Sequence, residues 1–545
     1  MYARFVLVIC FLLSAVVPAI AANQPKLVVL ITVDQLRGDI PMRFKERFGS
    51  GGFRYLMDKG AYYTNAHYQH ATNFTAVGHA TLATGGNGQQ HGLAGNDWHD
   101  FESNQQVYCV EDDRHNILGR PKKAHEGTSP RNLTSTTIGD ELIIATGKRS
   151  RVFSVSVKDR GAILPGGHLG KAFWYSTSTG EFVTSTYYYS DYPAWVKAWN
   201  GQKFADQYKD KAWTLMYEEK TYVNSIPDTH ERPYGGLSKA FPKAMSAVDP
   251  KKYYGALRFT PFGDELTLRF AQELLRQEKL GQGQHTDMLA ISFSVTDYIG
   301  HAHGIESVEY EDNILRLDRT LAELFKTIDT EVGLSRTLIV LSSDHGMDMV
   351  PENKSELGYE AGRHYPEKFI DTVNAGLQKR YNTKEKLVIA FWNPSLYLDL
   401  KAVQNLQLDR AAVEDALAEE ILKVPGMSLA VTRTNLLRGD VPDNPIMNKV
   451  QRSFHTKRSG NVVIVQDPYW YLYPKPEEFA GMHGSPYSYD TYVPIMIAGP
   501  GVGAQAVARP VAPEDIASTV ALYLGTVPPS GSVGSPLVEV FGEKP

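Results

Sequence analysis

Short, almost wholly apolar runs recur along this chain, and longer stretches with helical spacing separate them. The apolar runs are LVVLITV at Leu27–Val33, RVFSVSV at Arg151–Val157, MLAISFSV at Met288–Val295 and TLIVL at Thr337–Leu341. Helical spacing is found at Ile138–Thr146, Phe262–Leu280 and Val308–Val332. Nearly continuous apolar strands are typical of a sheet that is buried on both faces. The alternation therefore predicts an α/β fold, with a central, mainly parallel sheet flanked by helices.

Each apolar run is followed by a polar residue that can take part in chemistry. Asp34, Lys158, Asp297 and Asp344 each stand at or just beyond the end of one run. In open sheets of this type, ligands bind beyond the carboxyl ends of the strands. We therefore expect these four side chains to share one site.

Two segments interrupt the strand–helix pattern. Residues 164–261 are rich in Tyr, Trp and Lys, and residues 349–481 mix charged helical stretches with turns. We interpret both as insertions that wall the site of a single catalytic domain covering residues 22–545. The core pattern then resumes, with a strand at Val493–Ala498 and a helix at Pro513–Leu524.

The N-terminus has the features of a cleavable secretory signal at residues 1–21. One cation precedes the apolar stretch Phe5–Val17, and the small residues Ala19 and Ala21 stand where a signal peptidase reads. We therefore expect a secreted protein with no membrane anchor after cleavage. The short signal and the absence of disulfides favour the periplasm of a Gram-negative cell.

Cysteine content and charge exclude several classes of protein. Cys109 is the only cysteine beyond the signal, so the mature chain cannot form an internal disulfide or a cysteine-rich zinc site. The formal net charge is −5, and no basic stripe stands out. Nucleic acid is therefore not expected as a partner.

Six residues have the types and positions expected of metal ligands. They are Asp34, Asp297, His301, Asp344, His345 and His483. Zinc accepts histidine nitrogen and carboxylate oxygen, and catalytic sites keep one position open. Three aspartates and three histidines can serve two such ions.

The segment that begins near Ala71 contains a candidate nucleophile. Thr75 opens a predicted helix, with Asn73 as the expected cap, and His79 is interpreted as a packing residue one turn later. The amide groups and the dipole at a helix N-terminus favour an oxyanion such as phosphate. A threonine hydroxyl needs activation, which metal coordination can supply.

A pair of cations follows the second predicted strand. Lys158 and Arg160 are two residues apart, and in an extended chain both side chains would point to one side. Arginine offers two parallel donors to phosphate oxygens, and lysine offers a point charge. Asn96 could add a neutral donor.

Taken together, these motifs resemble those of a known superfamily. The stretches TDYIGHAHG, SSDHG and GMHGS, with Asp34 and Thr75, resemble the metal-site order of the alkaline phosphatase superfamily. The resemblance is greatest to the phosphate-irrepressible, PafA-type alkaline phosphatases, and it extends over the whole mature chain. It implies an alkaline phosphatase-like sandwich with insertions capping the active site.

The resemblance also implies the roles of individual residues. One zinc would be bound by Asp297, His301 and His483. A second zinc would be bound by Asp34, Asp344 and His345, with Thr75 as the alkoxide. Asn96, Lys158 and Arg160 would contact the phosphoryl oxygens. His303, His91, His99 and His364 are interpreted as non-ligands.

The expected function is zinc-dependent hydrolysis of small-molecule phosphomonoesters, with two Zn²⁺ per subunit and a covalent phosphothreonine at Thr75. Two cations and an amide favour a monoester dianion over a diester. The alternatives are a nucleotide pyrophosphatase or phosphodiesterase of the same superfamily and a non-catalytic zinc-binding export protein. A sulfatase is disfavoured by the threonine, and a cofactor-independent mutase by the secretory signal. The physiological substrate and the oligomeric state stay open.

Overall fold

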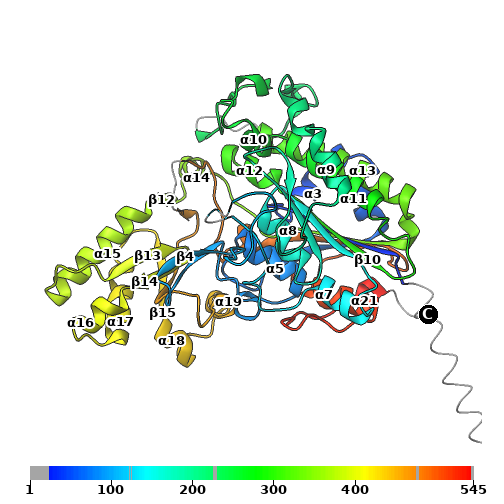
Figure 1. The fold of residues 1–545 in the computed structure, drawn as a ribbon. Coiled ribbons are helices and arrows are strands. Elements are labelled where there is room, and N and C mark those ends of the chain that lie inside the picture. Colours follow the sequence, from blue (N-terminus) through cyan, green and yellow to red (C-terminus); the bar gives the residue numbers. More distant parts are fainter. Residues whose placement is uncertain (1–23, 122, 124–125, 225–229, 474–477, 542–545) are drawn as a thin grey trace, which may run out of the picture.

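A nine-stranded sheet forms the centre of the computed structural model (Figure 1). The structure describes residues 24–121, 123, 126–224, 230–473 and 478–541, so the expected signal peptide lies outside the described residues. From edge to edge, the strands are β19 (Gln505–Val507), β2 (Ala61–His67), β18 (Tyr492–Ala498), β11 (Thr337–Ser342), β1 (Leu27–Val33), β10 (Asp287–Phe293), β5 (Val152–Ser156), β6 (Lys171–Tyr175) and β7 (Phe182–Val183).

Five adjacent strands, β11, β1, β10, β5 and β6, run parallel to one another. Val29 of β1 lies opposite Leu289 of β10 and Ile339 of β11. Strands β18 and β7 are antiparallel to their inner neighbours. The predicted mainly parallel sheet is confirmed, and the carboxyl ends of its middle strands lie along one edge.

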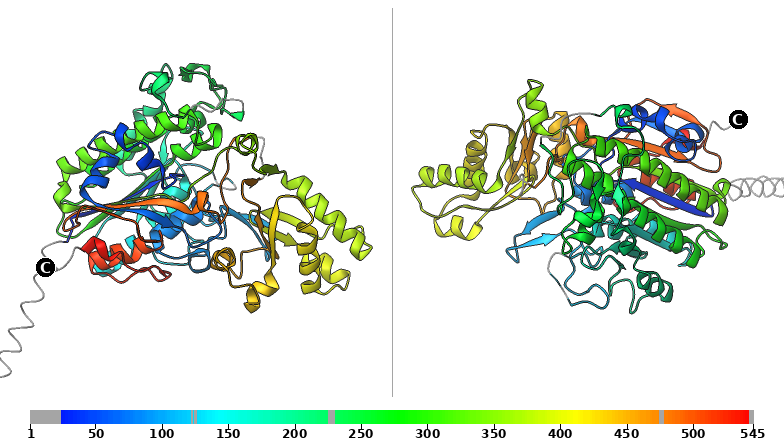
Figure 2. Two further views of the ribbon diagram at one scale, coloured as in Figure 1. Left: turned by 180° about the vertical axis from the view of Figure 1, so that it is seen from behind. Right: turned by 90° about the horizontal axis from the view of Figure 1, so that it is seen from above.

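Both faces of the sheet are covered, as the unbroken apolar runs predict. Leu27, Val29 and Ile31 of β1 belong to a core with α11 (Phe262–Gln277) and α13 (Val308–Glu331). Val28 and Leu30 belong to a second core with α7 (Ile138–Ala145) and α21 (Asp515–Leu524). Figure 2 shows these helices on opposite sides of the sheet. Each such buried side chain contributes about 1.5–3 kcal/mol relative to exposure.

Three helices begin at the residues predicted from sequence. Thr137 and Asp140 form a reciprocal cap at the start of α7, in which each side chain accepts a hydrogen bond from the other's backbone NH. Ser307 accepts from the NH of Tyr310 at the start of α13. These caps satisfy amide groups that the first helical turn leaves without partners. The ends of α7, α11 and α13 come slightly earlier than predicted.

The first expected insertion, 164–261, begins later in the structure than predicted. Strands β6 and β7 fall inside that range and belong to the central sheet. The chain leaves the sheet only after Val183, and it then forms α9 (Ala194–Gly201), the pair β8 (Ala212–Trp213) and β9 (Lys243–Ala244), and α10 (Tyr253–Ala256). The aromatic composition at 171–183 reflects strand packing and not an insertion.

The second expected insertion, 349–481, contains a lobe with its own core, drawn in yellow in Figure 1. Its four-stranded antiparallel sheet has the order β13 (Val388–Trp392), β14 (Ser395–Leu398), β16 (Val462–Gln466) and β15 (Met427–Thr432). Its core is formed with α15 (Pro366–Tyr381), α16 (Leu400–Asn405) and α17 (Arg410–Ile421). The helices α18 (Arg433–Arg438) and α19 (Pro445–Ser453) of the same insertion belong to a separate hydrophobic cluster that includes Ala71. Strands β12 (Gly362–His364) and β17 (Trp470–Leu472) pair where the chain enters and leaves it.

Shorter elements connect these units. They include α3 (Ile40–Arg43), α4 (Phe53–Lys59), α6 (Gly88–His91), α14 (Pro351–Glu356), and a hairpin of β3 (Asp97–Asp100) and β4 (Gln105–Tyr108). Cys109 follows the hairpin and is buried in a hydrophobic cluster. Its burial among apolar side chains makes Cys109 a packing residue.

Candidate active site

The carboxyl ends of four neighbouring strands supply most of the predicted site residues. These residues are Asp34 after β1, Lys158 after β5, Asp297 and His301 in the helix after β10, and Asp344 and His345 after β11. All six are buried. The parallel arrangement of the strands places them at one edge of the sheet, as expected for an open α/β fold.

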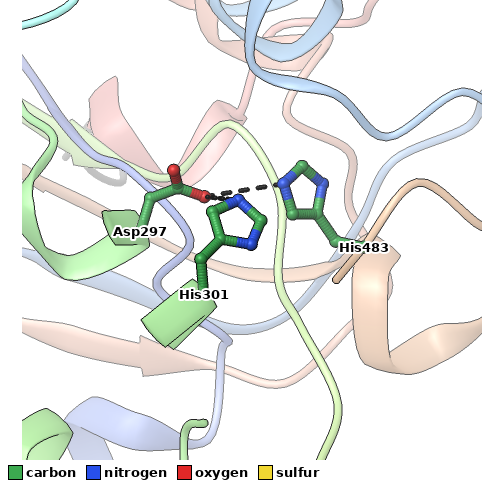
Figure 3. Close-up of side chains that lie close together, drawn as sticks. All are labelled: Asp297, His301 and His483. Carbon is green, nitrogen blue, oxygen red and sulfur yellow. Dashed lines mark ion pairs between the residues drawn. The ribbon is translucent and has the colours of Figure 1, made fainter. Parts of the chain in front are cut away.

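The first group of potential ligands is Asp297, His301 and His483 (Figure 3). Asp297 and His301 lie one turn apart in α12 (Val295–His303), and Oδ1 of Asp297 is 3.2 Å from Nε2 of His301 and 3.5 Å from Nε2 of His483. The Nδ1 atoms of the two histidines lie 2.8 and 2.7 Å from the carbonyls of Gly481 and Asn73, respectively. Such outer contacts fix the ring orientation of metal-binding histidines.

Asp490 of α20 (Ser488–Thr491) fixes the loop that carries His483. Its Oδ2 accepts hydrogen bonds from the NH of Gly484 at 2.9 Å, and from the NH and Oγ of Ser485 at 2.7 and 2.6 Å. Gly484 has a φ of +118°, which side chains rarely adopt. Asp490 was not singled out in the sequence, because only the folded loop brings it to residues 484 and 485.

The second predicted group is Asp34, Asp344 and His345, and the structure divides it between two clusters of possible ligands, Asp34 with Asp344 and His79, and Asp34 with Asp297 and His345. Nε2 of His345 is 3.6 Å from Asp34 Oδ1 and 3.5 Å from Asp344 Oδ2. Oδ1 of Asp34 and Nε2 of His345 are buried without a hydrogen-bond partner, whereas Oδ2 of Asp34 pairs with Lys158 and Oδ2 of Asp344 pairs with His79. Buried polar atoms without hydrogen bonds cost about 1–3 kcal/mol each. A cation bound by these atoms would remove that cost, so the donor set fits a divalent metal.

Burial also sets the protonation of this group. Burial, reinforced by the charges of Asp344 and Asp297, raises the pKa of Asp34 well above its ordinary value. Burial lowers the pKa of His345 to about 3, so its imidazole stays neutral, the form that binds metals. Asp34, Asp297 and His345 also lie within ligand distance of one another. The two groups are therefore adjacent, and their histidine and carboxylate donors suit zinc.

Lys158 lies between the two groups. Its Nζ is 2.6 Å from Asp297 Oδ2, 2.8 Å from Asp34 Oδ2 and 3.4 Å from Thr75 Oγ1. Burial works against the charged amine, but the carboxylates of Asp297 and Asp34 outweigh it and raise the pKa of Lys158 above its ordinary value. A permanent positive charge therefore lies beside the Thr75 hydroxyl.

Thr75 is the first residue of α5 (Thr75–Thr84), as predicted, but the predicted cap is wrong. Asn73 donates from Nδ2 to the carbonyl of Ser485 at 2.6 Å and does not cap the helix. Oδ1 of Asn96 accepts from the NH of Ala76 at 2.9 Å instead. Asn96 precedes β3, and sequence proximity could not reveal this capping contact with α5.

Helix α5 packs directly on the end of β11. A Cβ added to Gly78 would lie 2.0 Å from the carbonyl oxygen of Asp344, so only glycine permits this approach. Nδ1 of His79 is 3.1 Å from Asp344 Oδ2, and its Nε2 is 2.8 Å from Oγ of Ser292. His79 is buried, as a packing residue would be, but it also contacts a potential metal ligand.

We predict that Gly78→Ala shifts α5 away from Asp344 and misplaces Thr75. Overpacking of this kind costs about 1–3 kcal/mol, and kcat/KM should fall by more than the loss of folded protein explains. Gly201→Ala is the matched control, because Gly201 is also helical and has no atom within 4 Å of an added Cβ. Thermal unfolding and kcat/KM measured together test the prediction. Equal changes in Tm and in kcat/KM for the two variants would contradict the prediction.

Arg160 lies in the first turn of α8 (Asp159–Gly166), and Lys158 is the N-cap of that helix. The predicted extended geometry is therefore wrong for this pair. Nη1 of Arg160 is 3.3 Å from the hydroxyl of Tyr108, which donates to Asp159 Oδ1 at 2.6 Å. Lys158 and Arg160 nevertheless line the same cavity, although the backbone between them begins a helix and is not extended.

Gln35 is a site residue that sequence reasoning missed. Its NH donates to Asp344 Oδ1 at 3.1 Å, and its Nε2 donates to Asp297 Oδ1 at 2.9 Å. Its φ of 68° lies in the left-handed region, which non-glycine residues adopt at a cost of order 1–3 kcal/mol. The only signal in the sequence is its position next to Asp34. Gln35 therefore links carboxylates of both groups.

The histidines interpreted as non-ligands lie in other surroundings. Nδ1 of His303 is 3.0 Å from Glu231, next to an ion pair between Lys243 and Glu309. Nε2 of His91 is 3.3 Å from Oγ1 of Thr81. Nε2 of His99 is 3.1 Å from Asn104, and the ring of His364 packs on that of Trp470. Within the part of the chain that the structure describes, none of the four belongs to either ligand group.

Comparisons with known proteins agree over almost the whole chain. The profile of the type I phosphodiesterase/nucleotide pyrophosphatase family matches residues 28–486. Alkaline phosphatase PafA of Elizabethkingia meningoseptica is 34% identical over 96% of this chain and 95% of its own. Alkaline phosphatase PhoV of Synechococcus elongatus is 35% identical over 95% of this chain and 93% of its own.

A solved structure of wild-type PafA has a TM-score of 0.88 at 34% identity, covering 95% of this chain and 99% of that one. A solved PafA variant, also with a TM-score of 0.88, is altered at one threonine, one asparagine, one lysine and one arginine. Their spacing along that chain equals the spacing of Thr75, Asn96, Lys158 and Arg160 here.

Proposed function

The chain belongs to the type I phosphodiesterase/nucleotide pyrophosphatase family of the alkaline phosphatase superfamily, and we propose from this membership how its site works. It is an alkaline phosphatase, an enzyme that hydrolyses phosphate monoesters. The proposed mechanism rests on one observation. Thr75, Lys158 and two groups of buried potential ligands lie close together at one edge of the sheet.

The proposed cofactors are two Zn²⁺ ions per subunit. Asp297, His301 and His483 would hold one ion, and Asp34, Asp344 and His345 would hold the other with Thr75. Orphaned buried atoms in the second group and the ring-orienting contacts in the first support this assignment. When bound, the two ions would stabilise negative charge on the attacking and leaving oxygens.

The proposed nucleophile is Oγ1 of Thr75. Its proton passes to solvent, Oγ1 attacks phosphorus, and the bond from phosphorus to the leaving oxygen breaks, which gives a phosphothreonine and an alcohol that takes a proton from water. Water then attacks phosphorus, the bond from phosphorus to Oγ1 breaks, and inorganic phosphate leaves while Oγ1 takes back a proton from solvent. Two features favour the deprotonated hydroxyl: the ammonium of Lys158 at 3.4 Å and the N-terminus of α5.

Asn96, Lys158 and Arg160 form the proposed phosphoryl clamp. The Oδ1 of Asn96 is engaged by the NH of Ala76, which leaves its amide NH₂ to donate to a phosphoryl oxygen. Arg160 is oriented by Tyr108 and is positively charged at all relevant pH values. A monoester dianion presents one more charged oxygen than a diester, so this clamp favours monoesters.

We predict that Lys158→Ala combined with Arg160→Ala lowers kcat/KM for p-nitrophenyl phosphate at least about 100-fold more than for bis-p-nitrophenyl phosphate. Each lost charge-assisted hydrogen bond is worth about 1.5–3 kcal/mol, and the diester has less charge to lose. The double variant Lys209→Ala with Arg269→Ala is a control, because Lys209 is exposed, Arg269 is half-buried, and both stack on aromatic rings outside the site. Equal losses on the two substrates would refute the selective role of the clamp.

The proposed activity is tested most directly by kcat/KM on the same two substrates with the zinc-loaded wild-type protein, with and without a chelator. A large, chelator-sensitive preference for the monoester is expected. A preference for the diester would indicate a phosphodiesterase, as the family description also allows.

Export to the periplasm with removal of residues 1–21 is a further part of the proposal. It is supported by the apolar stretch between Phe5 and Val17 and the small residues after it. Among residues 24–541 that the structure describes, no helix has both the length and the apolar character to cross a membrane. Mass spectrometry of the exported protein should find an N-terminus at residue 22, and an intact N-terminus would contradict cleavage.

A further inference from the structure

A cavity of about 300 Å³ lies beside the phosphoryl clamp. Lys158 and Arg160 form part of its lining, and Trp174 and Ser176 from the end of β6 form another part. Arg258, in the short helix Leu257–Phe259 that precedes α11, completes the side that faces α12. Any group that extends from a phosphoryl held by the clamp can therefore reach this space.

Tyr298 connects the cavity to the reaction centre. It follows Asp297 in α12, and its ring lies between two cations. The Nζ of Lys158 is 5.0 Å from the ring centroid, and the guanidinium carbon of Arg258 is 4.6 Å from it. Nη1 of Arg258 also donates to the Tyr298 hydroxyl at 2.7 Å. The tyrosine thus fixes Arg258 at a set position relative to the clamp.

Arg258 has no carboxylate within ion-pair distance among the residues that the structure describes. Its other hydrogen bond is a long one of 3.4 Å from Nε to the carbonyl of Gly255. Arg120, on the same cavity, differs because it binds Glu181 at 2.9 Å and Ser176 at 2.7 Å. Both terminal nitrogens of Arg120 are therefore engaged, whereas Arg258 hydrogen-bonds through Nε and Nη1 and keeps Nη2 for a ligand.

The charge of the lining is carried by five cationic side chains, at residues 120, 123, 158, 160 and 258, and by the two acidic residues Glu126 and Asp159. Three of the cations are paired with carboxylates: Lys123 with Glu126, Arg120 with Glu181, and Lys158 with Asp34 and Asp297. Arg160 and Arg258 therefore carry most of the positive charge that remains for an anion, and low-dielectric walls strengthen its attraction.

We propose that this cavity binds a second anionic group, a phosphate or a carboxylate, carried by the leaving alcohol, and that Arg258 is its main contact. The inference rests on the proposed function, in which the leaving oxygen lies beside Asp297, His301 and His483. Tyr298 directly follows Asp297, so the cavity lies on the leaving-group side of the clamp. The preferred substrates would be bisphosphates of small polyols and sugars, and phosphorylated hydroxy acids.

Three substrates, whose leaving alcohols share a three-carbon chain and differ in the group at its far end, distinguish which anion the cavity binds. They are 3-hydroxypropyl phosphate, propane-1,3-diyl bisphosphate and 3-(phosphonooxy)propanoate. Per cleavable ester, kcat/KM of the wild-type enzyme should be about tenfold higher for at least one anionic substrate than for the neutral alcohol, mainly through a lower KM. If kcat/KM is higher for only one of the two anionic substrates, the cavity binds the anion that this substrate carries.

Arg258→Gln should reduce that ratio of kcat/KM values about tenfold, whereas Arg269→Gln should leave it unchanged. Arg269 is the matched control because it is an arginine stacked on Phe204, outside the cavity. A wild-type ratio near one for both anions, or a ratio that Arg258→Gln does not alter, would overturn the inference. If the wild-type enzyme fails to hydrolyse 3-hydroxypropyl phosphate at all, the proposed function itself fails.

Discussion

Thr75→Ala should abolish formation of the phosphoenzyme and lower kcat/KM on p-nitrophenyl phosphate by a factor on the order of 10⁴ or more. Loss of a covalent nucleophile removes the first step altogether, and the remaining activity would come from binding and electrostatics alone. Thr75 is buried at the start of α5 with Lys158 at 3.4 Å, and no other described hydroxyl lies within hydrogen-bond distance of the Lys158 amine. Rapid quench with ³²P-labelled substrate measures the phosphoenzyme directly.

Thr75→Ser is the conservative control for this prediction. It keeps the hydroxyl at the helix N-terminus and should still give a labelled enzyme, now with phosphoserine. If the Thr75→Ala enzyme turns over near the wild-type rate, Thr75 is not the nucleophile. A labelled peptide outside α5 would show that another residue is phosphorylated.

Removal of the metal ions is expected to abolish activity and to lower Tm. Asp34, Asp297 and Asp344 are buried together, and Oδ1 of Asp34 has no hydrogen-bond partner. Without bound cations their mutual repulsion is offset only in part, by Lys158, which pairs with Asp34 and Asp297, and by the histidines beside Asp297 and Asp344. A ligand present at 100 times its Kd stabilises a folded protein by about 2.7 kcal/mol, so chelation should be visible in thermal unfolding. Elemental analysis should find two zinc ions per chain before chelation.

Single variants distinguish the two metal positions. His301→Ala should lower the zinc content to about one ion per chain and reduce kcat/KM on the order of 10³-fold, a loss typical of removed electrostatic stabilisation. His364→Ala is the matched control, because His364 packs on Trp470 in the lobe and should leave the zinc content at two. Full zinc content in the His301→Ala protein would contradict the ligand assignment.

The sequence was sufficient to predict those site residues that stand at the ends of strands. Asp34, Asp297 and Asp344 come at the ends of apolar runs, and parallel strands bring such ends to one edge. The structure brings these residues together at that edge, with His301 one helical turn from Asp297. The same regularity predicted α7, α11 and α13, because a buried helical face leaves a clear periodic pattern.

The sequence was insufficient where contacts join distant segments or depend on local backbone geometry. Asn73 looked like a cap by proximity, but Asn96 caps α5 from a separate loop. Lys158 and Arg160 were expected in extended chain, but a helix begins between them. The left-handed backbone of Gln35 leaves no pattern in composition or periodicity. The lobe between residues 366 and 472 also could not be foreseen as a body with its own core.

The pairing of β12 with β17 brings the two ends of that lobe together before the chain reaches His483. The lobe packs its own hydrophobic core, and it also packs on the central body, through Tyr397 beside Trp98 and through α19 against Ala71. Sequence changes confined to the lobe's own core can accumulate without displacing the strand ends that carry Asp34, Asp297 and Asp344. Members of the family can therefore diverge in this core while the chemistry stays the same.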